Sequence, residues 1–275
     1  MPFIDPHIHC ASRVTDDYER MAIAGCMAVS EPAFWAGFDR GTPMAFRDYF
    51  RQLVEVEPKR AARYGIKHYT WLCINPKEAE DVAFSREVIA LIPEFLEDPS
   101  VLGVGEIGLN KITHNEIIIF REQVALAQRH QKLIMVHTPH LEDKWKGTRI
   151  ILEVLREMQV DPGRVLIDHV EEHTAPLALD QGYWVGITLY PSSKCSIPRA
   201  IDIVERFGPS RILMNSGGDW GQSDPLAVPK LQVQMRLRGQ SMVNIQAVTY
   251  TNSLRFFALS GKIEAPESFG LAAHS

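Results

Sequence analysis

The amino-acid sequence predicts an α/β fold, a (β/α)8 TIM barrel formed as a single domain, and three observations indicate it. Short apolar runs rich in β-branched residues alternate eight times with longer stretches of helical composition, the pattern of parallel strands joined by crossover helices. The length of 275 residues suits one such barrel, which commonly takes about 250 residues. The sequence has no glycine-rich phosphate loop after its first expected strand, as an open doubly wound sheet normally would.

The barrel elements are expected where these runs fall. The expected strands are residues 3–9, 26–30, 68–75, 101–106, 133–138, 165–170, 183–189 and 211–216. A helix is expected to begin at Pro76, because proline suits a first helical turn and acidic residues follow it. Apolar residues at helical spacing predict another helix over 115–130, and Gly182 suits a helix C-terminus. We expect the barrel to span residues 1–262 and residues 263–275 to form a C-terminal tail.

One irregular segment departs from a minimal barrel. Residues 31–43 follow the second expected strand and carry three aromatic side chains, Phe34, Trp35 and Phe38. A loop after a strand lies at the C-terminal face of a barrel, where the active sites of this fold form. We therefore expect the segment to wall or cap a pocket.

The composition favours a small substrate or a metal ion over nucleic acid. The chain has 29 Lys and Arg against 34 Asp and Glu, and the net charge of −5 is the wrong sign for neutralising phosphates along a polymer. No apolar run approaches the roughly 18 residues of a membrane span, and the N-terminus lacks the features of a signal peptide, so we expect a cytoplasmic protein. The four cysteines form no CxxC pair, which argues against a cysteine zinc site.

Residues of metal-ligand type stand at the ends of several expected strands. The first strand ends in Asp5-Pro-His7-Ile-His9, and alternation along a strand predicts that Asp5 and both imidazoles share a face. The further candidates at strand ends are Glu106, His137, His169 and, after the eighth strand, Asp219. A single histidine at such a place is more often structural, but burying this many ionisable groups together without a metal is costly.

Four histidines and two acids are enough ligands for two divalent ions. Histidine nitrogen and carboxylate oxygen suit borderline and harder ions, and carboxylates can bridge two ions about 3.5 to 4 Å apart. We expect two ions per chain, zinc or manganese, with magnesium, iron or nickel as alternatives.

For other polar residues the sequence allows more than one role. Glu31 could be a further ligand, an acceptor for a histidine N–H, or a cap. His140, His173 and Glu171 are expected near the barrel mouth, as pocket lining or as ligands of an additional ion. Asp168 precedes His169 and is expected to face the opposite way, as a structural acid. The lysines that could meet a substrate phosphate, but are expected to be solvated loop charges, are Lys111, Lys144, Lys146 and Lys194.

Taken in this order, these residues make the sequence resemble the TatD-like metal-dependent hydrolases of the amidohydrolase superfamily over most of its length. The motifs that carry the resemblance are Asp5-Pro-His7-Ile-His9, Gly105-Glu106-Ile107-Gly108-Leu109, Val136-His137-Thr138, His169, Gly218-Asp219 and Asn252-Ser-Leu-Arg-Phe-Phe. The resemblance implies that His7 and His9 hold one ion and that Glu106 bridges to a second. It also implies that His137 and His169 hold the second ion, and that Asp219 acts at the bound water as ligand and general base.

The sequence departs from the usual TatD pattern at Asn110, where aspartate is usual, and at Gly217-Gly218-Asp219, where Glu-Thr-Asp is usual. It is more similar to a branch of the family apart from the deoxyribonucleases. Three functions stay open at this stage: hydrolysis of a phosphoester; hydrolysis of an amide, lactone or other carbonyl compound; and a non-hydrolytic role as a metal-dependent isomerase or binding module in a biosynthetic pathway. The sequence leaves the oligomeric state open.

Overall fold

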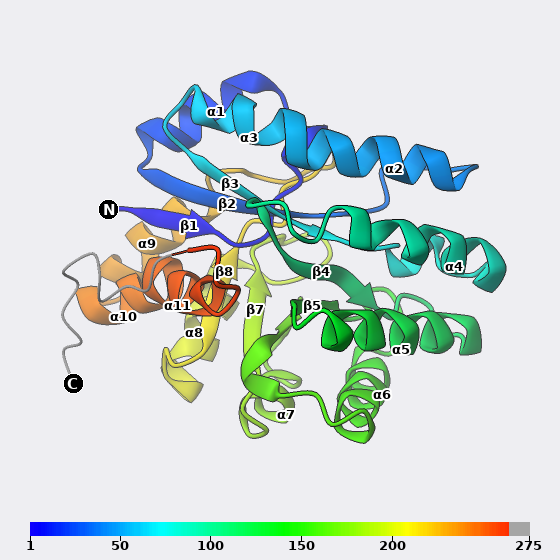
Figure 1. Cartoon of the computed structure of the whole chain (residues 1–275). Helices are drawn as coiled ribbons and strands as arrows, with labels where there is room; N and C mark the ends of the chain where they lie inside the picture. Colours follow the sequence, from blue (N-terminus) through cyan, green and yellow to red (C-terminus); the bar gives the residue numbers. More distant parts are fainter. Residues whose placement is uncertain (264–275) are drawn as a thin grey trace.

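The structure, a computed structural model, describes residues 1–263 and contains one nearly closed ring of alternating strands and helices (Figure 1). The strands are β1 Phe3–Asp5, β2 Cys26–Pro32, β3 Lys67–Leu72, β4 Val101–Gly108, β5 Leu133–His137, β6 Val165–Asp168, β7 Trp184–Thr188 and β8 Ile212–Asn215. They form one eight-stranded sheet in chain order, and every neighbouring pair is parallel. The predicted TIM barrel is therefore confirmed.

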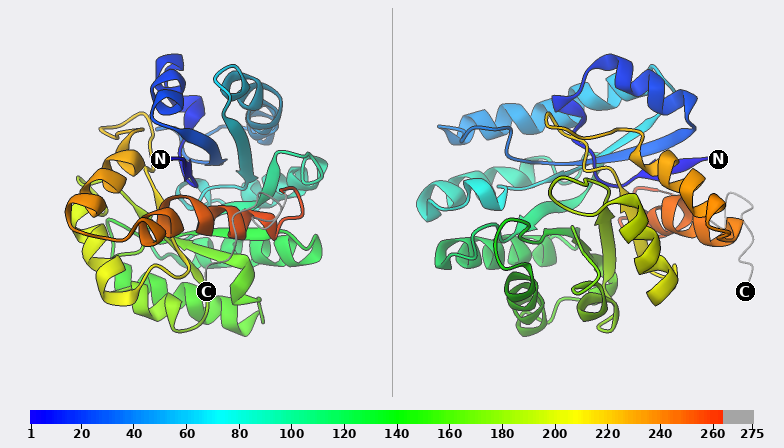
Figure 2. Two further views of the ribbon diagram at one scale, coloured as in Figure 1. Left: turned by 90° about the vertical axis from the view of Figure 1, so that its left-hand side faces the viewer. Right: turned by 180° about the vertical axis from the view of Figure 1, so that it is seen from behind.

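Eleven α-helices lie among residues 1–263, mostly around the outside of the strands (Figure 2). They are α1 Thr15–Ile23, α2 Pro43–Arg51, α3 Glu57–Ala62, α4 Val82–Leu91, α5 His114–Arg129, α6 Lys144–Glu157, α7 Ala175–Leu179, α8 Ile197–Phe207, α9 Ala227–Leu237, α10 Met242–Gln246 and α11 Asn252–Ala258. Five-residue π-helical segments, Gln52–Val56 and Ala247–Thr251, join α2 to α3 and α10 to α11. None of these helices is long and apolar enough to cross a membrane.

Local chemistry explains where these helices begin. Thr113 accepts a hydrogen bond from the Glu116 N–H and caps α5, which covers the range expected for the helix at 115–130. The helix expected at Pro76 begins as a single 3-10 turn, Pro76–Glu78, and α4 itself starts after the Asp81 cap. The tail expected over 263–275 lies, except for Ile263, outside the described residues.

Alternating strand residues divide the core in two. One cluster lies inside the barrel and takes residues from every strand. These interior residues include Ile4, Ala28, Trp71, Leu102, Leu133, Met135, Leu166 and Leu213, with Trp184 partly buried against them. The larger cluster lies between the strands and the surrounding helices.

The N-terminal end of the barrel is filled by aromatic rings. Helix α11 crosses this end (Figure 2, left), and its Phe256 ring stacks on Trp71 with centroids 6.0 Å apart. Phe256 also contacts Trp184, and Phe257 meets Trp71 edge-on at 6.2 Å. The interior is therefore apolar from this end up to the middle of the strands.

The first and last strands meet beyond their regular ends. Ile8 and Gly218 form an isolated parallel bridge, in which His9 N–H donates to the Gly218 carbonyl at 2.7 Å and Gly217 N–H donates to the His7 carbonyl at 2.9 Å. The backbone of His7 and His9 therefore links the first strand to the last, and the same two residues carry imidazoles that were predicted to be metal ligands.

Candidate metal centre

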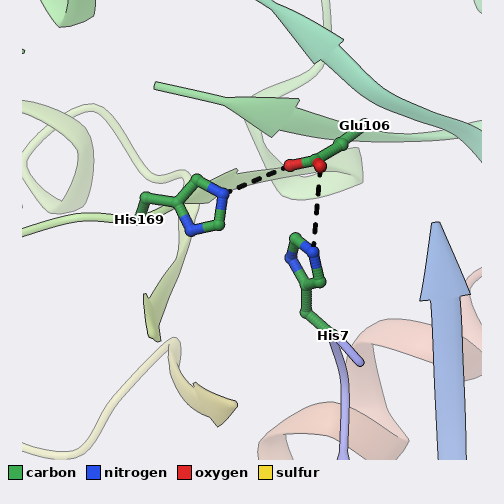
Figure 3. A group of neighbouring side chains, drawn as sticks. All are labelled: His7, Glu106 and His169. Carbon is green, nitrogen blue, oxygen red and sulfur yellow. Dashed lines mark hydrogen bonds and ion pairs between the residues drawn. The ribbon is translucent and has the colours of Figure 1, made fainter. Parts of the chain in front are cut away.

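Five of the sequence-predicted ligands come together at the C-terminal end of the barrel interior. His7, His9, Glu106, His137 and His169 are each only 1–5% exposed. Glu106 lies between the histidines: its Oε2 is 2.9 Å from His137 Nδ1 and 3.2 Å from His169 Nε2, and its Oε1 is 3.9 Å from His7 Nε2. Figure 3 shows His7 and His169 each pointing at a different oxygen of this carboxylate.

Each of the four imidazoles donates a hydrogen bond through Nδ1. His7 Nδ1 donates to Asp168 Oδ2, and His9 Nδ1 donates to the Pro32 carbonyl at 3.2 Å. His137 Nδ1 donates to Glu106, and His169 Nδ1 donates to the Thr188 hydroxyl at 2.7 Å. An imidazole that is neutral and donates through Nδ1 carries a lone pair on Nε2, so in the neutral form each of these four side chains offers Nε2 as an acceptor.

Three of these Nε2 atoms face other acceptors. His7 Nε2 and His9 Nε2 are 3.0 Å apart, and His169 Nε2 faces the Glu106 carboxylate at 3.2 Å. The Nε2 atom of His137 is buried without a hydrogen-bond partner among residues 1–263. Buried acceptors that face each other need a positive charge between them, either a proton or a metal ion. The donor set is entirely nitrogen and oxygen, which fits divalent transition metals.

The pKa shifts favour the ligand forms of most of these groups. Burial lowers the pKa of His9, His137 and His169, which keeps these imidazoles neutral. Burial opposes ionisation of Glu106, but His137 and His7 hold its pKa well below the usual range. The exception is His7: burial lowers its pKa, but Glu106 and Asp168 outweigh that effect and raise it.

Asp168 belongs to the site, and the expectation that it faces away is wrong. Its carboxylate accepts from His7 Nδ1, from His169 N–H at 2.8 Å and from Asn215 Nδ2 at 2.9 Å. Asp168 faces inward because it lies two residues after Leu166, an interior residue of the same strand. The strand ends there, and the left-handed φ of +59° at His169 turns the next side chain inward as well.

Asp5 faces the outer side of the strand, so the expectation that it shares a face with His7 and His9 is wrong. Strand β1 ends at Asp5, and the next residue, Pro6, has no N–H to continue the ladder. Asp5 Oδ1 accepts from the Ser216 N–H at 3.1 Å and the His7 N–H at 3.3 Å, on the outer side of the strand. The chain turns after Pro6 and carries both imidazoles into the barrel mouth.

Asp219 lies on the loop after β8 and is held from several directions. Its Oδ1 accepts from the Gly221 N–H at 2.7 Å and the Tyr190 hydroxyl at 3.3 Å, and Arg13 donates to its carbonyl oxygen at 2.7 Å. Asp219 lines the same cavity as the five clustered residues, but within residues 1–263 no hydrogen bond joins its carboxylate to them. The carboxylate is thus placed to act on a group inside the cavity.

The cavity above the cluster has a volume of about 190 Å³. Two tryptophans from different loops, Trp35 and Trp220, flank it with ring centroids 6.4 Å apart, and Phe34 stacks on His9 at 3.9 Å. The expectation that residues 31–43 wall a pocket is therefore confirmed for Phe34 and Trp35. The side chain of Phe38 is 64% exposed and does not line this cavity.

The additional candidates lie in different places. Glu31 is buried on the outer side of the sheet, where His68 Nε2 lies 2.8 Å from its Oε2 and the Ala11 N–H donates to its Oε1. His140 lines the cavity, and its ring is 5.7 Å from that of His137. The exposed His173 stacks on Trp145, outside the cavity.

Glu171 also lies outside the cavity, where it pairs with Arg199 at 2.8 Å. The expectation of a solvated charge at Lys144 is wrong: this residue is only 8% exposed. Its ammonium donates to the His169 carbonyl at 2.6 Å and lies 3.5 Å from Glu171. Lys144 therefore supports the turn that carries His169.

Sequence reasoning missed several residues of the site. Asn75 Nδ2 donates to Glu106 Oε1 at 3.2 Å, and Lys77 and Tyr190 line the cavity. Asn75 ends an expected strand, and Lys77 and Tyr190 follow expected strands, so the signal that identified the histidines was also present for these three residues. Their residue types are common on loops, and this made the signal weak.

Comparisons with known proteins find a matching family and similar structures. The sequence model of the family described as "TatD related DNase" matches residues 4–258. A relative in Methanocaldococcus jannaschii, described as an uncharacterized metal-dependent hydrolase, is 29% identical over 259 residues, which cover 93% of this chain and 100% of the relative. The chain is also similar to a TatD-like protein from Archaeoglobus fulgidus of known crystal structure, with a TM-score of 0.77 and 27% identity over 93% of this chain and 100% of that one.

A more distant structure shares the fold. It is the phosphotriesterase homology protein from Escherichia coli, crystallised with phosphate in its active site. The TM-score is 0.68 at 16% identity, over 93% of this chain and 98% of that chain.

Proposed function

Because the chain belongs to the TatD related DNase family and is a metal-dependent hydrolase, we propose that it uses two divalent metal ions to hydrolyse a phosphoester. The observation that carries the proposal is the set of four buried imidazoles around Glu106. His7 Nε2 and His9 Nε2 lie 3.0 Å apart, and His169 Nε2 and His137 Nδ1 both face the Glu106 carboxylate. Family membership favours hydrolysis over the isomerase and binding-module alternatives. The family description names an enzyme of phosphodiester chemistry, which favours the phosphoester over a carbonyl substrate.

In this proposal, the ligands divide into two groups that share Glu106. His7 and His9 would hold one ion, His137 and His169 would hold the other, and Glu106 would be a ligand shared by both. Histidine nitrogens outnumber carboxylate oxygens, which favours zinc or manganese over magnesium. The four cysteines are buried and none of them lines the cavity, so no thiolate competes for the ions.

Divalent ions in such a centre lower the pKa of water toward about 7 and polarise the oxygen that gathers charge during the reaction. The protein supplies the proton transfer. Asp219 takes a proton from the attacking water through the carboxylate oxygen that Gly221 and Tyr190 do not occupy, and passes it to the leaving group. Asp168 keeps His7 in the tautomer that presents Nε2, as carboxylates commonly do for metal-binding histidines.

Elemental analysis of the purified protein tests the metal centre. We expect two ions per chain in the wild type and one or none in the His7→Ala, His9→Ala double variant. The matched control is His114→Ala, an exposed histidine outside the cavity, which should keep both ions. A wild-type protein that neither contains nor rebinds metal would overturn the proposal.

A substrate screen with the metal found then separates the two kinds of hydrolysis. Bis(p-nitrophenyl) phosphate and p-nitrophenyl phosphate report phosphoester cleavage, while p-nitrophenyl acetate and a simple lactone report attack on a carbonyl. Faster turnover of a phosphoester supports the proposal. Turnover of the carbonyl substrates alone would replace it with the carbonyl alternative.

A further inference from the structure

Two lysines at the cavity have no anionic partner within the described part of the chain. Lys77 lies in the 3-10 turn after β3, and Lys194 lies in the loop after β7, on the opposite side of the barrel. Both line the cavity above the metal cluster, and neither ammonium forms a hydrogen bond or ion pair with any of residues 1–263. Each packs on an aromatic ring instead: Lys77 Nζ is 5.1 Å from the Trp35 centroid and Lys194 Nζ is 4.8 Å from the Tyr190 centroid.

Other lysines among residues 1–263 either lie near a carboxylate or, as at Lys59, Lys67, Lys111 and Lys146, are exposed at the surface. Lys132 lies 2.9 Å from Glu97, Lys230 lies 2.5 Å from Asp224, and Lys144 lies 3.5 Å from Glu171. Acidic residues outnumber basic ones in the sequence, so partners are plentiful. Lys194 is nevertheless only partly exposed, and a cation withdrawn from water without a partner is costly. The two ammonium groups are thus free to meet an anion that enters the cavity.

The simplest structural role for these lysines is to balance the carboxylates of the site. That role would suffice for a metal-free protein, because Glu106, Asp168 and Asp219 carry three negative charges. Two divalent ions would supply four positive charges and leave the site positive before either lysine is counted. With both lysines the excess becomes three charges, and this favours a substrate group of high negative charge.

The size of the cavity restricts what that group can be. The volume of about 190 Å³ is below the usual range for pockets that enclose drug-sized ligands, roughly 300–1,000 Å³. Trp35 and Trp220 flank the cavity with ring centroids 6.4 Å apart. A terminal phosphate fits both the charge and the space.

We propose that Lys77 and Lys194 hold the non-bridging oxygens of a terminal phosphate, and that the substrate is a small phosphomonoester. This inference rests on the proposed function and narrows its substrate class. Water adds to phosphorus, and the ester P–O bond breaks. The alcohol leaves with the proton that Asp219 took from the water, so the products are the alcohol and inorganic phosphate.

The test compares Lys77→Gln, Lys194→Gln and the double variant with wild type, all loaded with metal. Lys111→Gln, an exposed lysine outside the cavity, is the matched control. We expect each substitution to lower kcat/KM for p-nitrophenyl phosphate by roughly 10- to 100-fold, the value of a hydrogen bond to a charged group. The loss should be smaller for the monoanionic bis(p-nitrophenyl) phosphate and absent for the neutral p-nitrophenyl acetate.

Inorganic phosphate gives a readout that needs no turnover. Calorimetric titration of the metal-loaded proteins should show weaker phosphate binding in the lysine variants, with metal content unchanged. Equal losses on charged and neutral esters, or unaltered phosphate affinity, would overturn the inference. A protein that cleaves only neutral esters but still binds phosphate through both lysines would overturn the phosphoester function while supporting the anion site.

Discussion

The two ends of the barrel interior are built from the same strands but differ in their side chains: one end is apolar and the other holds buried polar groups. At the N-terminal end, Trp71 and Phe256 fill the space with apolar contacts that need no further partner. At the C-terminal end, strands β5 and β4 present His137 and Glu106, and the buried Nε2 of His137 has no hydrogen-bond partner among residues 1–263. The comparison indicates that one end provides stability, while the other holds groups that a cation and a substrate complete.

The largest expected effect concerns activity alone. Asp219→Asn removes the proposed proton acceptor but keeps an oxygen for Gly221 and Tyr190 to hold. We expect turnover to fall by roughly 10²- to 10⁴-fold, with little change in Tm. Steady-state kinetics and thermal melting of the same preparation measure both, and near-normal turnover would contradict the role of Asp219.

Phe256→Ala should lower stability and leave activity unchanged, the reverse of Asp219→Asn. This ring is fully buried against Trp71 and Trp184, so its removal leaves a cavity at the N-terminal end. We expect the free energy of unfolding to fall by about 3–5 kcal/mol, as measured by denaturant titration. Metal content and kcat of the folded fraction should stay unchanged; loss of metal would mean that the two ends are coupled.

Asp168→Asn probes the support of the metal centre. The amide no longer provides a carboxylate for His7 Nδ1, so the imidazole is less firmly held in the tautomer that presents Nε2. We expect metal affinity to weaken by about 10- to 100-fold, measured by competition with a chelator dye. Asp161→Asn at an exposed 3-10 turn is the control, and unchanged affinity in Asp168→Asn would assign it a structural role only.

The smallest effect is expected on the helical shell, far from both ends. Arg86 pairs with Glu122 at 2.7 Å, and 59% of the Arg86 side chain is exposed. Solvent screens such a pair, so Arg86→Ala should change the free energy of unfolding by less than about 1 kcal/mol and leave metal content and turnover unchanged. A larger loss of unfolding free energy in denaturant titration would show that this surface ion pair contributes more to stability than solvent screening predicts.

Local pattern was sufficient for the barrel and for the clustered ligands. Each strand needs apolar residues on both faces, and this produces runs that can be recognised without any contact information. The histidines and Glu106 were predictable because parallel strands deliver their C-terminal ends to one place. Asp168 was not predicted because the side of a residue depends on where strand β6 ends and on the left-handed turn at His169.

The sequence by itself therefore determined the order of strands and helices, the end of the barrel that carries the chemistry, and the donor types available there. Only the tertiary structure decided which atoms meet: that Asp5 turns outward, that Asp168 orients His7, and that Lys144 supports His169. The physical reason is the separation along the chain over which each interaction acts. Periodicity and residue type act over a few neighbours, whereas these contacts join segments far apart in the chain, and burial decides which of their polar atoms remain without a partner.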